Sequence, residues 1–247
     1  MNIIQTENLT KIYGKGTTAV TALDHVNIVV KEGEFVAVMG PSGCGKSTLL
    51  HLLGGLDRPS EGQVIIEGTP LTEMSDDRLT EMRRRKIGFV FQFFNLIPVL
   101  SAVENAALPI TLDSVKPAEA KARATDWLDR FGLSDRLNNR PDQLSGGQQQ
   151  RVAVARALVA DPALILADEP TGNLDTRAGD EIANLLRDVS KKYNRTVIMV
   201  THDPRIAAYA DRIIFLKDGK VIDETLLERK NVNNAEMVAD KMKEMAD

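Results

Sequence analysis

Residues 35–50 read FVAVMGPSGCGKSTLL, and this stretch decides the fold class. Its first five residues form an uninterrupted apolar run, which is typical of a strand buried on both faces of a parallel sheet. A glycine-rich loop follows at once, and the apolar residues of STLLHLLGGL, from Ser47 to Leu56, then recur at helical spacing. We therefore predict a strand, a tight loop and a helix in that order.

The loop GPSGCGKS matches the pattern G-x-x-x-x-G-K-[ST], in which backbone N–H groups converge on phosphate oxygens. Lys46 would add a positive charge for the outer phosphates, and Ser47 a hydroxyl for Mg²⁺. The alternative is a glycine turn that only connects strand to helix, but a chance match in a chain of this length is on the order of one in a hundred. The predicted phosphate-binding residues are Gly40, Pro41, Ser42, Gly43, Cys44, Gly45, Lys46 and Ser47.

Apolar strands alternate with helical patterns along the rest of the chain, which is typical of a parallel sheet with crossover helices. Strands are predicted at 35–40, 61–68, 86–92, 163–170 and 195–203, and helices at 117–132, from LSGGQ to 160, and at 178–192. Asp218–Gly219 predicts a hairpin turn. We expect a single α/β domain over 1–247. Its core, with an N-terminal β subdomain, covers 1–92 and 151–225; a mostly helical insert covers 93–150 and a tail 226–247.

Composition limits the classes of function. The formal net charge is −4, so no overall basic field attracts nucleic acid, and we expect no nucleic-acid partner. Cys44 is the single cysteine, which suits a reducing compartment; we expect it to be a small filler of the loop rather than a redox switch. The start lacks a charged leader with an apolar run, and the uncharged stretch 88–103 is too short to span a bilayer. We expect a cytoplasmic chain that reaches a membrane only through a partner.

Adjacent carboxylates end the apolar strand of ILADEP, at Asp168 and Glu169. Such acids are unfavourable beside a buried run unless they meet a cation or donors. Asp168 fits the Mg²⁺ shell and Glu169 fits the group that orients or deprotonates the attacking water, although acids also occur at ordinary strand exits. Gln92 and His202 end two other apolar strands and would face the same edge of the sheet, unless they are simply surface residues.

A second glycine-rich helix start lies far downstream, in QLSGGQQQR at 143–151. Ser145 and Gln148 fit a capping box, which by itself describes an ordinary helix start. The intervening Gly146 and Gly147 are unfavourable in a first helical turn by roughly 1 kcal/mol each, and capping does not require them. Because the first loop already encloses one set of phosphates, we predict that Ser145–Gln148 face the nucleotide of a second copy of the chain.

Taken together, GPSGCGKST, Gln92, LSGGQ, ILADEP, NLD and His202 resemble, in this order, the nucleotide-binding subunit of an ABC transporter. The resemblance extends to about residue 225. It implies a RecA-like P-loop ATPase core with an N-terminal β subdomain and an inserted helical subdomain, binding ATP and Mg²⁺ and hydrolysing ATP.

The resemblance also implies roles for single residues. Tyr13 would stack on adenine, Thr48 would help Lys46 and Ser47 to grip phosphates, and Asp175 would lie at the dimer seam. Gln92 would contact Mg²⁺ and report to a partner, and His202 would hold the γ-phosphate. The implied catalytic residues are Glu169, His202 and Lys46, the implied metal-binding residues are Ser47, Gln92 and Asp168, and Ser145, Gly146, Gly147, Gln148 and Asp175 would bind nucleotide across the dimer.

GGLDRPSEG, FVFQFFNLIPVLSAVENAALP and LADEPTGNLD are similar to the subgroup that serves lipoprotein release, macrolide export and antimicrobial-peptide resistance. That similarity implies an integral membrane, permease-like partner, with four spans and a large external domain. The alternative is a cell-division-type ATPase that regulates a membrane complex without transport. Soluble ABC ATPases of DNA repair or translation carry long coiled-coil insertions or a second ATPase domain, for which 247 residues leave no room.

The apolar residues after Gln92 are a candidate docking surface for the partner, because exposed apolar patches often mark interfaces. The alternative is that they fill a small core inside the insert. They are Phe93, Phe94, Leu96, Ile97, Val99 and Leu100. In the tail, Val238, Met242 and Met245 share one helical face, and we expect that face to pack on the chain's own domain rather than to act in regulation.

Overall fold

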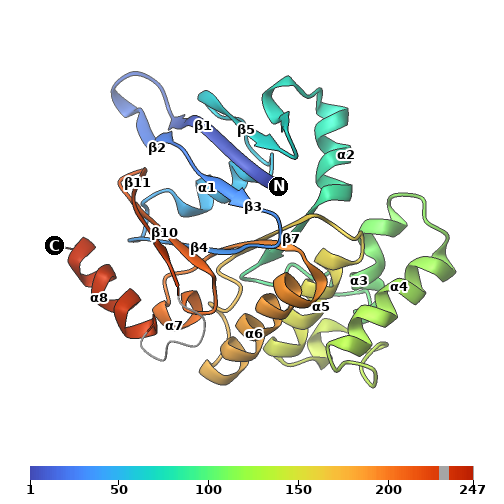
Figure 1. The fold of residues 1–247 in the computed structure, drawn as a ribbon. Coiled ribbons are helices and arrows are strands. Elements are labelled where there is room, and N and C mark those ends of the chain that lie inside the picture. The colour runs from blue at the N-terminus through green and yellow to red at the C-terminus, as the bar shows by residue number, and fades with distance from the viewer. Residues whose placement is uncertain (228–233, 247) are drawn as a thin grey trace.

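The computed structural model describes residues 1–227 and 234–246 (Figure 1). Its main sheet has six strands in the order β11-β10-β4-β9-β8-β7. All neighbouring pairs are parallel except β10 with β11. The strands are β7 (Ile87–Phe91), β4 (Phe35–Met39), β8 (Leu164–Asp168), β9 (Thr196–Val200), β10 (Arg212–Lys217) and β11 (Lys220–Leu226). The predicted parallel sheet is confirmed, and its predicted strands are one to four residues shorter than expected.

A second, antiparallel sheet lies above the main one in Figure 1. It contains β1 (Asn2–Tyr13), β2 (Val20–Val26), β3 (Val29–Lys31), β5 (Glu61–Ile66) and β6 (Thr69–Pro70). Helix α1 (Lys46–Leu53) packs between the two sheets, because Leu49, Leu50, Leu52 and Leu53 share one buried cluster with residues of both. The helix that begins at the phosphate-binding motif is therefore fixed from two sides.

Alternating residues of β4 point to opposite faces of the main sheet, as a strand requires. Val36 and Val38 join the α1 cluster, whereas Phe35, Ala37 and Met39 join the larger cluster on the other face. That face is covered by α5 (Gly146–Leu158), α6 (Thr176–Tyr193) and α7 (Pro204–Ala207). All five residues of β4 are buried, which explains why its sequence shows no polar alternation.

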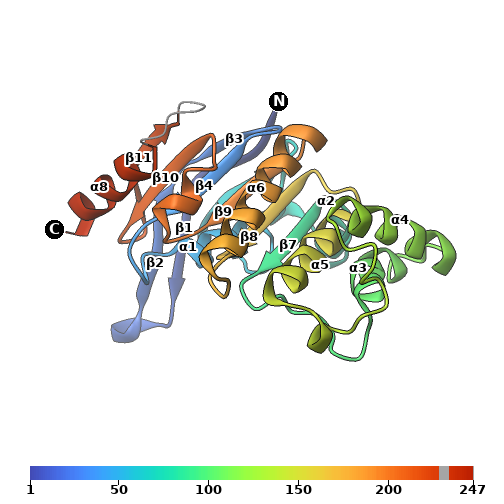
Figure 2. The same ribbon diagram turned by 90° about the horizontal axis from the view of Figure 1, so that it is seen from below.

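Helices α3 (Ala102–Thr111) and α4 (Pro117–Arg130) lie beside α5 at one end of the molecule (Figure 2). Ser101 caps α3 with Glu104 in a capping box, and α4 begins at its proline. Both helices lie within residues 93–150, where the sequence predicts a mostly helical insert. The expected boundary at residue 150 falls inside α5, so Ser145–Gln148, called the signature segment from here on, and the core share one continuous helix.

Two parts of the chain complete the fold. Helix α2 (Asp76–Lys86) precedes β7, and α8 (Asn234–Ala246) packs at the end of the molecule opposite α4 (Figure 2). In α8, Val238 and Met245 are buried and Met242 packs on the same core, in line with the expectation for the tail. Residues 228–233 and 247 of the predicted tail lie outside the described residues.

The predicted hairpin turn lies between β10 and β11. Asp218 and Gly219 have φ values of +50° and +77°, as a type I′ hairpin between β10 and β11 requires.

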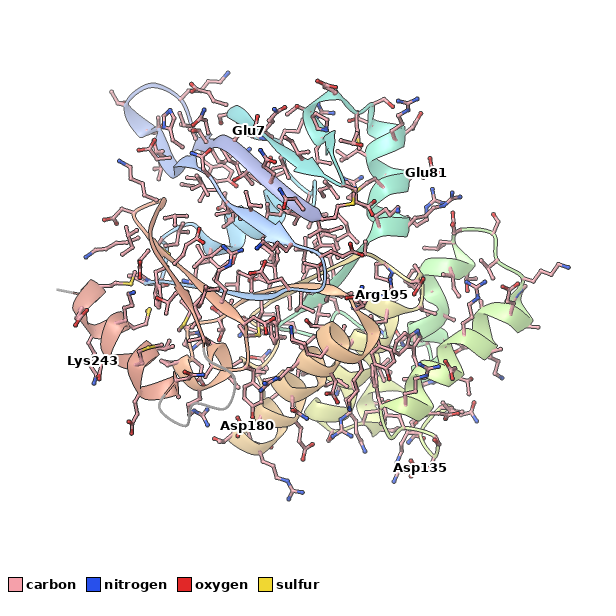
Figure 3. The ribbon with its side chains drawn as sticks, in the orientation of Figure 1. Glu7, Glu81, Asp135, Asp180, Arg195 and Lys243 are labelled. Carbon is pink, nitrogen blue, oxygen red and sulfur yellow. The ribbon has the colours of Figure 1, made fainter. Side chains whose placement is uncertain are left out.

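Charged side chains such as Glu81, Asp135 and Lys243 project from the rim of the molecule (Figure 3). Within residues 1–227 and 234–246, no helix has both the length and the apolar content needed to span a bilayer.

Candidate functional site

The phosphate loop connects the buried end of β4 to the start of α1. Gly45 immediately precedes α1 with φ +105°, and a Cβ there would lie 2.3 Å from the carbonyl oxygen of Ala22. A Cβ at Gly40 would lie 2.0 Å from the carbonyl oxygen of Leu216. At both positions, close approach of another backbone segment requires glycine.

Lys46 is buried at 8% exposure although it carries a charge. Its ammonium donates to the carbonyl oxygens of Gly40, at 2.9 Å, and Pro41, at 2.8 Å, so the loop's own backbone holds it in place. A phosphate would compete with these carbonyls for the same three N–H donors. Cys44 is also buried, and burial raises the pKa of its thiol, which keeps it neutral and favours the small-filler interpretation.

A cavity of about 520 Å³ opens over this loop. Four segments far apart in the sequence border it: β2, through Ala22; the loop with the start of α1; Glu169, which follows β8; and His202, two residues after the end of β9. The bordering residues are Ala22, Ser42, Gly43, Gly45, Lys46, Ser47, Thr48, Glu169 and His202. The structure therefore brings Lys46, Glu169 and His202 to one place, as the strand-end argument predicted.

Ser47 and Asp168 form a pair of hard oxygen donors beside the cavity. The Ser47 hydroxyl donates to Asp168 Oδ1 at 3.1 Å. Within residues 1–227 and 234–246, no group of three or more His, Cys, Asp or Glu side chains could hold a metal by itself. A hydroxyl and one carboxylate instead suit Mg²⁺, which usually takes one or two carboxylates together with substrate phosphates.

Asp168→Asn should raise the melting temperature at neutral pH in the absence of nucleotide and Mg²⁺. Burial raises the pKa of Asp168, with the nearby Glu169 adding to the effect. Above that raised pKa, the charged carboxylate lowers the free energy of unfolding; below the ordinary pKa it is protonated in both states and has no effect. Asparagine can still accept the Ser47 hydrogen bond.

Thermal denaturation of both proteins over a pH series checks this prediction, and the difference in melting temperature should shrink toward acid pH. A difference that grows on acidification would contradict it. Glu181→Gln serves as the control, because that carboxylate is exposed on α6 and pairs with Arg151 away from the cavity.

Glu169 and His202 face each other across the ends of β8 and β9. His202 Nδ1 lies 3.1 Å from Glu169 Oε2. Glu169 has a left-handed backbone, with φ +43°, and its N–H donates to the carbonyl oxygen of Val200 at 3.0 Å. A carboxylate and an imidazole in hydrogen-bond contact can orient a water molecule and move a proton.

Gln92 follows β7 and lies against the loop that comes after Glu169. Its amide donates to Asn173 Oδ1 at 3.3 Å, and Asn173 donates to the carbonyl oxygen of Gln92 at 3.1 Å. A Cβ at Gly172 would lie 2.8 Å from Gln92 Nε2. The contacts of Asn173, which belongs to the NLD motif, and of Gly172 with Gln92 are not predicted by the sequence.

Tyr13 does not border the cavity. Its hydroxyl donates to Asp57 Oδ2 at 3.0 Å, and the Lys11 ammonium lies 4.9 Å from its ring centroid. Tyr13 is 42% exposed, and its backbone stands opposite Val20 in the antiparallel pair of β1 and β2. Stacking of Tyr13 on adenine stays a prediction. Ala22, which borders the cavity, was missed because a lone alanine in a strand carries no chemical signal.

The signature segment forms the start of α5, apart from the cavity. Ser145 Oγ accepts a hydrogen bond from the Gln148 N–H, and Gln148 Oε1 accepts one from the Ser145 N–H, which completes the predicted capping box. None of Ser145–Gln148 borders the cavity of its own chain. Asp175 caps the neighbouring helix α6 by accepting from the Ala178 N–H at 2.9 Å.

The two signature glycines have a packing role that the sequence did not suggest. A Cβ at Gly146 would lie 3.2 Å from Leu174 Cδ2, and one at Gly147 would lie 3.3 Å from the Cβ of Ala178. Both distances are shorter than an ordinary van der Waals contact, so a Cβ at either position would require Leu174 or Ala178 to shift by a few tenths of an ångström. Packing against Leu174 and Ala178 can therefore explain both glycines without a bound ligand.

Comparisons with known proteins agree with this geometry. The family model described as ABC transporter matches residues 23–172. An uncharacterized ABC transporter ATP-binding protein of Methanocaldococcus jannaschii, MJ0796, is 49% identical over 91% of this chain and 97% of its own length. An uncharacterized ABC transporter ATP-binding protein of Thermotoga maritima is 51% identical over 89% of this chain and 93% of its own length.

Solved structures show the same fold. The dimeric post-hydrolysis structure of the MJ0796 ATP-binding cassette, bound to ADP and Pi, is 47% identical with a TM-score of 0.83, covering 92% of this chain and 99% of that one. CbiO1 of Clostridium perfringens, part of the ABC transporter complex cbiONQ, is 31% identical with a TM-score of 0.84, covering 98% and 92%. The sheet order, the phosphate loop and these likenesses confirm the RecA-like P-loop fold. The chain belongs to the ABC transporter family, as one of its ATP-binding and ATP-hydrolysing subunits.

Proposed function

We propose that two copies of this chain close around two ATP molecules and drive a membrane-embedded partner in export or mechanotransmission. One observation carries the proposal: the signature segment lies outside the cavity of its own chain, although its helix start offers N–H donors suited to phosphate. A second copy turned head to tail would place that helix start over the first copy's nucleotide. The dimeric MJ0796 structures, which are 47–48% identical to the chain, support dimerisation.

Each residue at the cavity receives a role. Lys46 exchanges its loop carbonyls for the outer phosphates, assisted by the loop amides and Thr48. Ser47 and Asp168 would hold Mg²⁺, with Gln92 nearby. Bound there, the ion would neutralise phosphate charge. Glu169 orients the attacking water and accepts its proton, and His202 holds the γ-phosphate at the same wall of the cavity.

Approximate magnitudes favour a reversible dimer. Two or three charge-assisted hydrogen bonds from each signature, at roughly 1.5–3 kcal/mol each, give about 6–18 kcal/mol over two sites. Association itself costs an estimated ~4–15 kcal/mol. The two sums nearly cancel, so ATP closes the dimer and loss of the γ-phosphate opens it. Such a cycle can perform mechanical work on a bound partner.

The apolar residues after Gln92 support a membrane partner. Phe93 is 72% exposed, Val99 70% and Ile97 38%, whereas Leu96 packs on the core and Phe94 is half-buried. The exposed residues Phe93, Ile97 and Val99 follow Gln92 in the sequence, so a partner helix docked on them could respond to changes at Gln92. We propose a cytoplasmic protein held at the inner face of the cell membrane by an integral, permease-like subunit, of the subgroup that the sequence resembles.

Replacing Phe93 and Val99 with aspartate should abolish capture of the membrane partner, because two charges would then have to be buried in an apolar interface. The tagged Glu169→Gln protein, with ATP and Mg²⁺, is used to capture proteins from detergent-solubilised membranes of its native cell, with and without the two substitutions. Phe93 and Val99 are better positions for charge than Phe94 and Leu96, which are partly buried.

Leu226→Asp is the matched control, since Leu226 is 76% exposed on β11 at the other end of the molecule. A four-span protein with a large external domain, captured by the control and lost with the double substitution, would support the export role. A partner bound to wall hydrolases would favour the cell-division role. Capture unaffected by the two aspartates would contradict the docking surface, and absence of any integral protein would contradict the membrane role.

A further inference from the structure

A fully buried amide lies behind the cavity. Gln150 belongs to α5, two residues after the end of the signature segment, and has 0% exposure. Its neighbours Val152, Ala153 and Val154 on the same helix are buried apolar residues. A polar side chain in such surroundings is unfavourable unless it forms hydrogen bonds, so its partners indicate why an amide stands here.

Both partners of Gln150 are backbone carbonyls next to functional residues. Gln150 Nε2 donates at 2.6 Å to the oxygen of Pro170, the residue after Glu169. The same nitrogen donates at 3.3 Å to the oxygen of Phe91, the residue before Gln92. The reverse orientation of the amide would place its oxygen against two carbonyl oxygens. One side chain of α5 thus holds the exits of the adjacent strands β7 and β8.

The exit from β8 needs such a restraint. Glu169 adopts φ +43°, a left-handed backbone conformation that is unfavourable for a residue other than glycine. The conformation persists only where surrounding contacts fix it. Backbone bonds supply part of this restraint, from the Glu169 N–H to Val200 and from the Gly172 N–H to Glu169, each at 3.0 Å. Gln150 holds the peptide that follows Pro170, by donating to the Pro170 carbonyl oxygen.

The same helix holds the far end of the Gln92 segment. Arg156 of α5 donates to the carbonyl oxygens of Phe94, at 2.7 Å, and Asn95. Burial lowers the pKa of Arg156, and both acceptor residues have left-handed backbones, with φ +60° and +49°. The segment 91–95, which carries Gln92, is therefore held at each end by α5.

We propose that Gln150 is a positioning residue for hydrolysis. Its two hydrogen bonds set the Glu169 carboxylate beside His202 and fix the start of the Gln92 segment, and they tie both to the helix whose first turn is the signature. A shift of α5 on docking of a second copy would thereby reach Glu169 and Gln92 directly. This inference rests on the role proposed above for Glu169.

Two substitutions test the proposal. Gln150→Met keeps the length and shape of the side chain but removes both donors. We expect ATP affinity and KM to stay within about threefold of wild type while kcat falls about 10- to 100-fold, the effect of a small misplacement of a catalytic group. Urea denaturation and the melting temperature show how much of the variant is folded, and kcat is expressed per folded molecule.

Gln150→Glu should give a pH dependence of kcat that a purely structural role would not produce. Burial raises the pKa of a carboxyl group, and its protonated form regains one O–H donor for the Pro170 carbonyl. The ratio of variant to wild-type kcat should therefore rise as pH is lowered from about 8 to 6. Gln149→Met, whose amide donates to Leu144 on the outer side of α5, is measured at each pH. Its kcat ratio to wild type should stay flat with pH, since pH effects common to all three proteins cancel in the ratio.

The outcomes separate this inference from the proposed function. If Glu169→Gln is slow while folded Gln150→Met hydrolyses like Gln149→Met, the positioning role of Gln150 is wrong and Glu169 keeps its role. If Glu169→Gln hydrolyses normally, the proposed function of Glu169 fails first. A KM increase without loss of kcat, a flat pH ratio for Gln150→Glu, or failure of both Gln150 variants to fold would each overturn the positioning role.

Discussion

Glu169→Gln should bind ATP with Mg²⁺ at close to wild-type affinity and yet hydrolyse it about 10²- to 10⁴-fold more slowly, the range typical of a lost general base. The substitution keeps the shape of the side chain and a hydrogen bond to His202, whose Nδ1 lies 3.1 Å from the carboxylate. It removes the proton acceptor. Because the γ-phosphate then persists, the closed dimer should accumulate with ATP and be absent with ADP.

Steady-state phosphate release and light scattering, with ATP or ADP present, measure the two effects. Glu181→Gln is the matched control: its carboxylate on α6 pairs with Arg151 and Arg177 outside the cavity, and hydrolysis should be unchanged. Near-normal hydrolysis by Glu169→Gln would remove this residue from its role. Slow hydrolysis without an ATP-dependent dimer would instead contradict the proposed head-to-tail dimer.

The parts of the fold that the sequence predicted are those in which local pattern and burial agree. Strands β4, β8 and β9 are buried along almost their whole length. Their sequences are therefore short, nearly continuous apolar runs, which is the pattern expected of strands covered on both faces. Glu169 and His202 could be predicted to lie together because the carboxyl ends of parallel strands meet at one edge of the sheet.

Other features left no comparable pattern. Helix α2 buries only Leu79 among its eleven residues, so it lacks an apolar stripe, and the sequence did not predict it. The contacts of Gly146 and Gly147 with α6 depend on how two helices approach each other, which no local pattern encodes. Gln150 was overlooked because a glutamine among glutamines resembles a solvated helix face; its significance lies in the carbonyls of two distant strand ends.

Ser145→Arg should weaken ATP-dependent dimerisation at least about tenfold while leaving the ATP affinity of the single chain unchanged. The first turn of α5 does not border its own cavity, so an arginine there should not disturb the nucleotide that the chain itself binds. In the proposed dimer, the added side chain would occupy the space of the partner's phosphates. In the Glu169→Gln background, which otherwise accumulates the dimer, we expect a loss of at least about tenfold in dimer affinity, corresponding to roughly one or two missing charge-assisted hydrogen bonds.

The capping role of Ser145 needs its own control, since losing an N-cap lowers stability by about 1 kcal/mol irrespective of any ligand. Ser101 supplies it: this serine closes a capping box of the same kind at the start of α3, away from the cavity. Ser101→Arg should lose similar stability but dimerise normally with ATP. If Ser145→Arg also dimerised normally, the signature would not contact the second copy. If it instead lost nucleotide affinity as a single chain, the signature would act on its own ATP, and the two glycines would owe their place to the packing against Leu174 and Ala178.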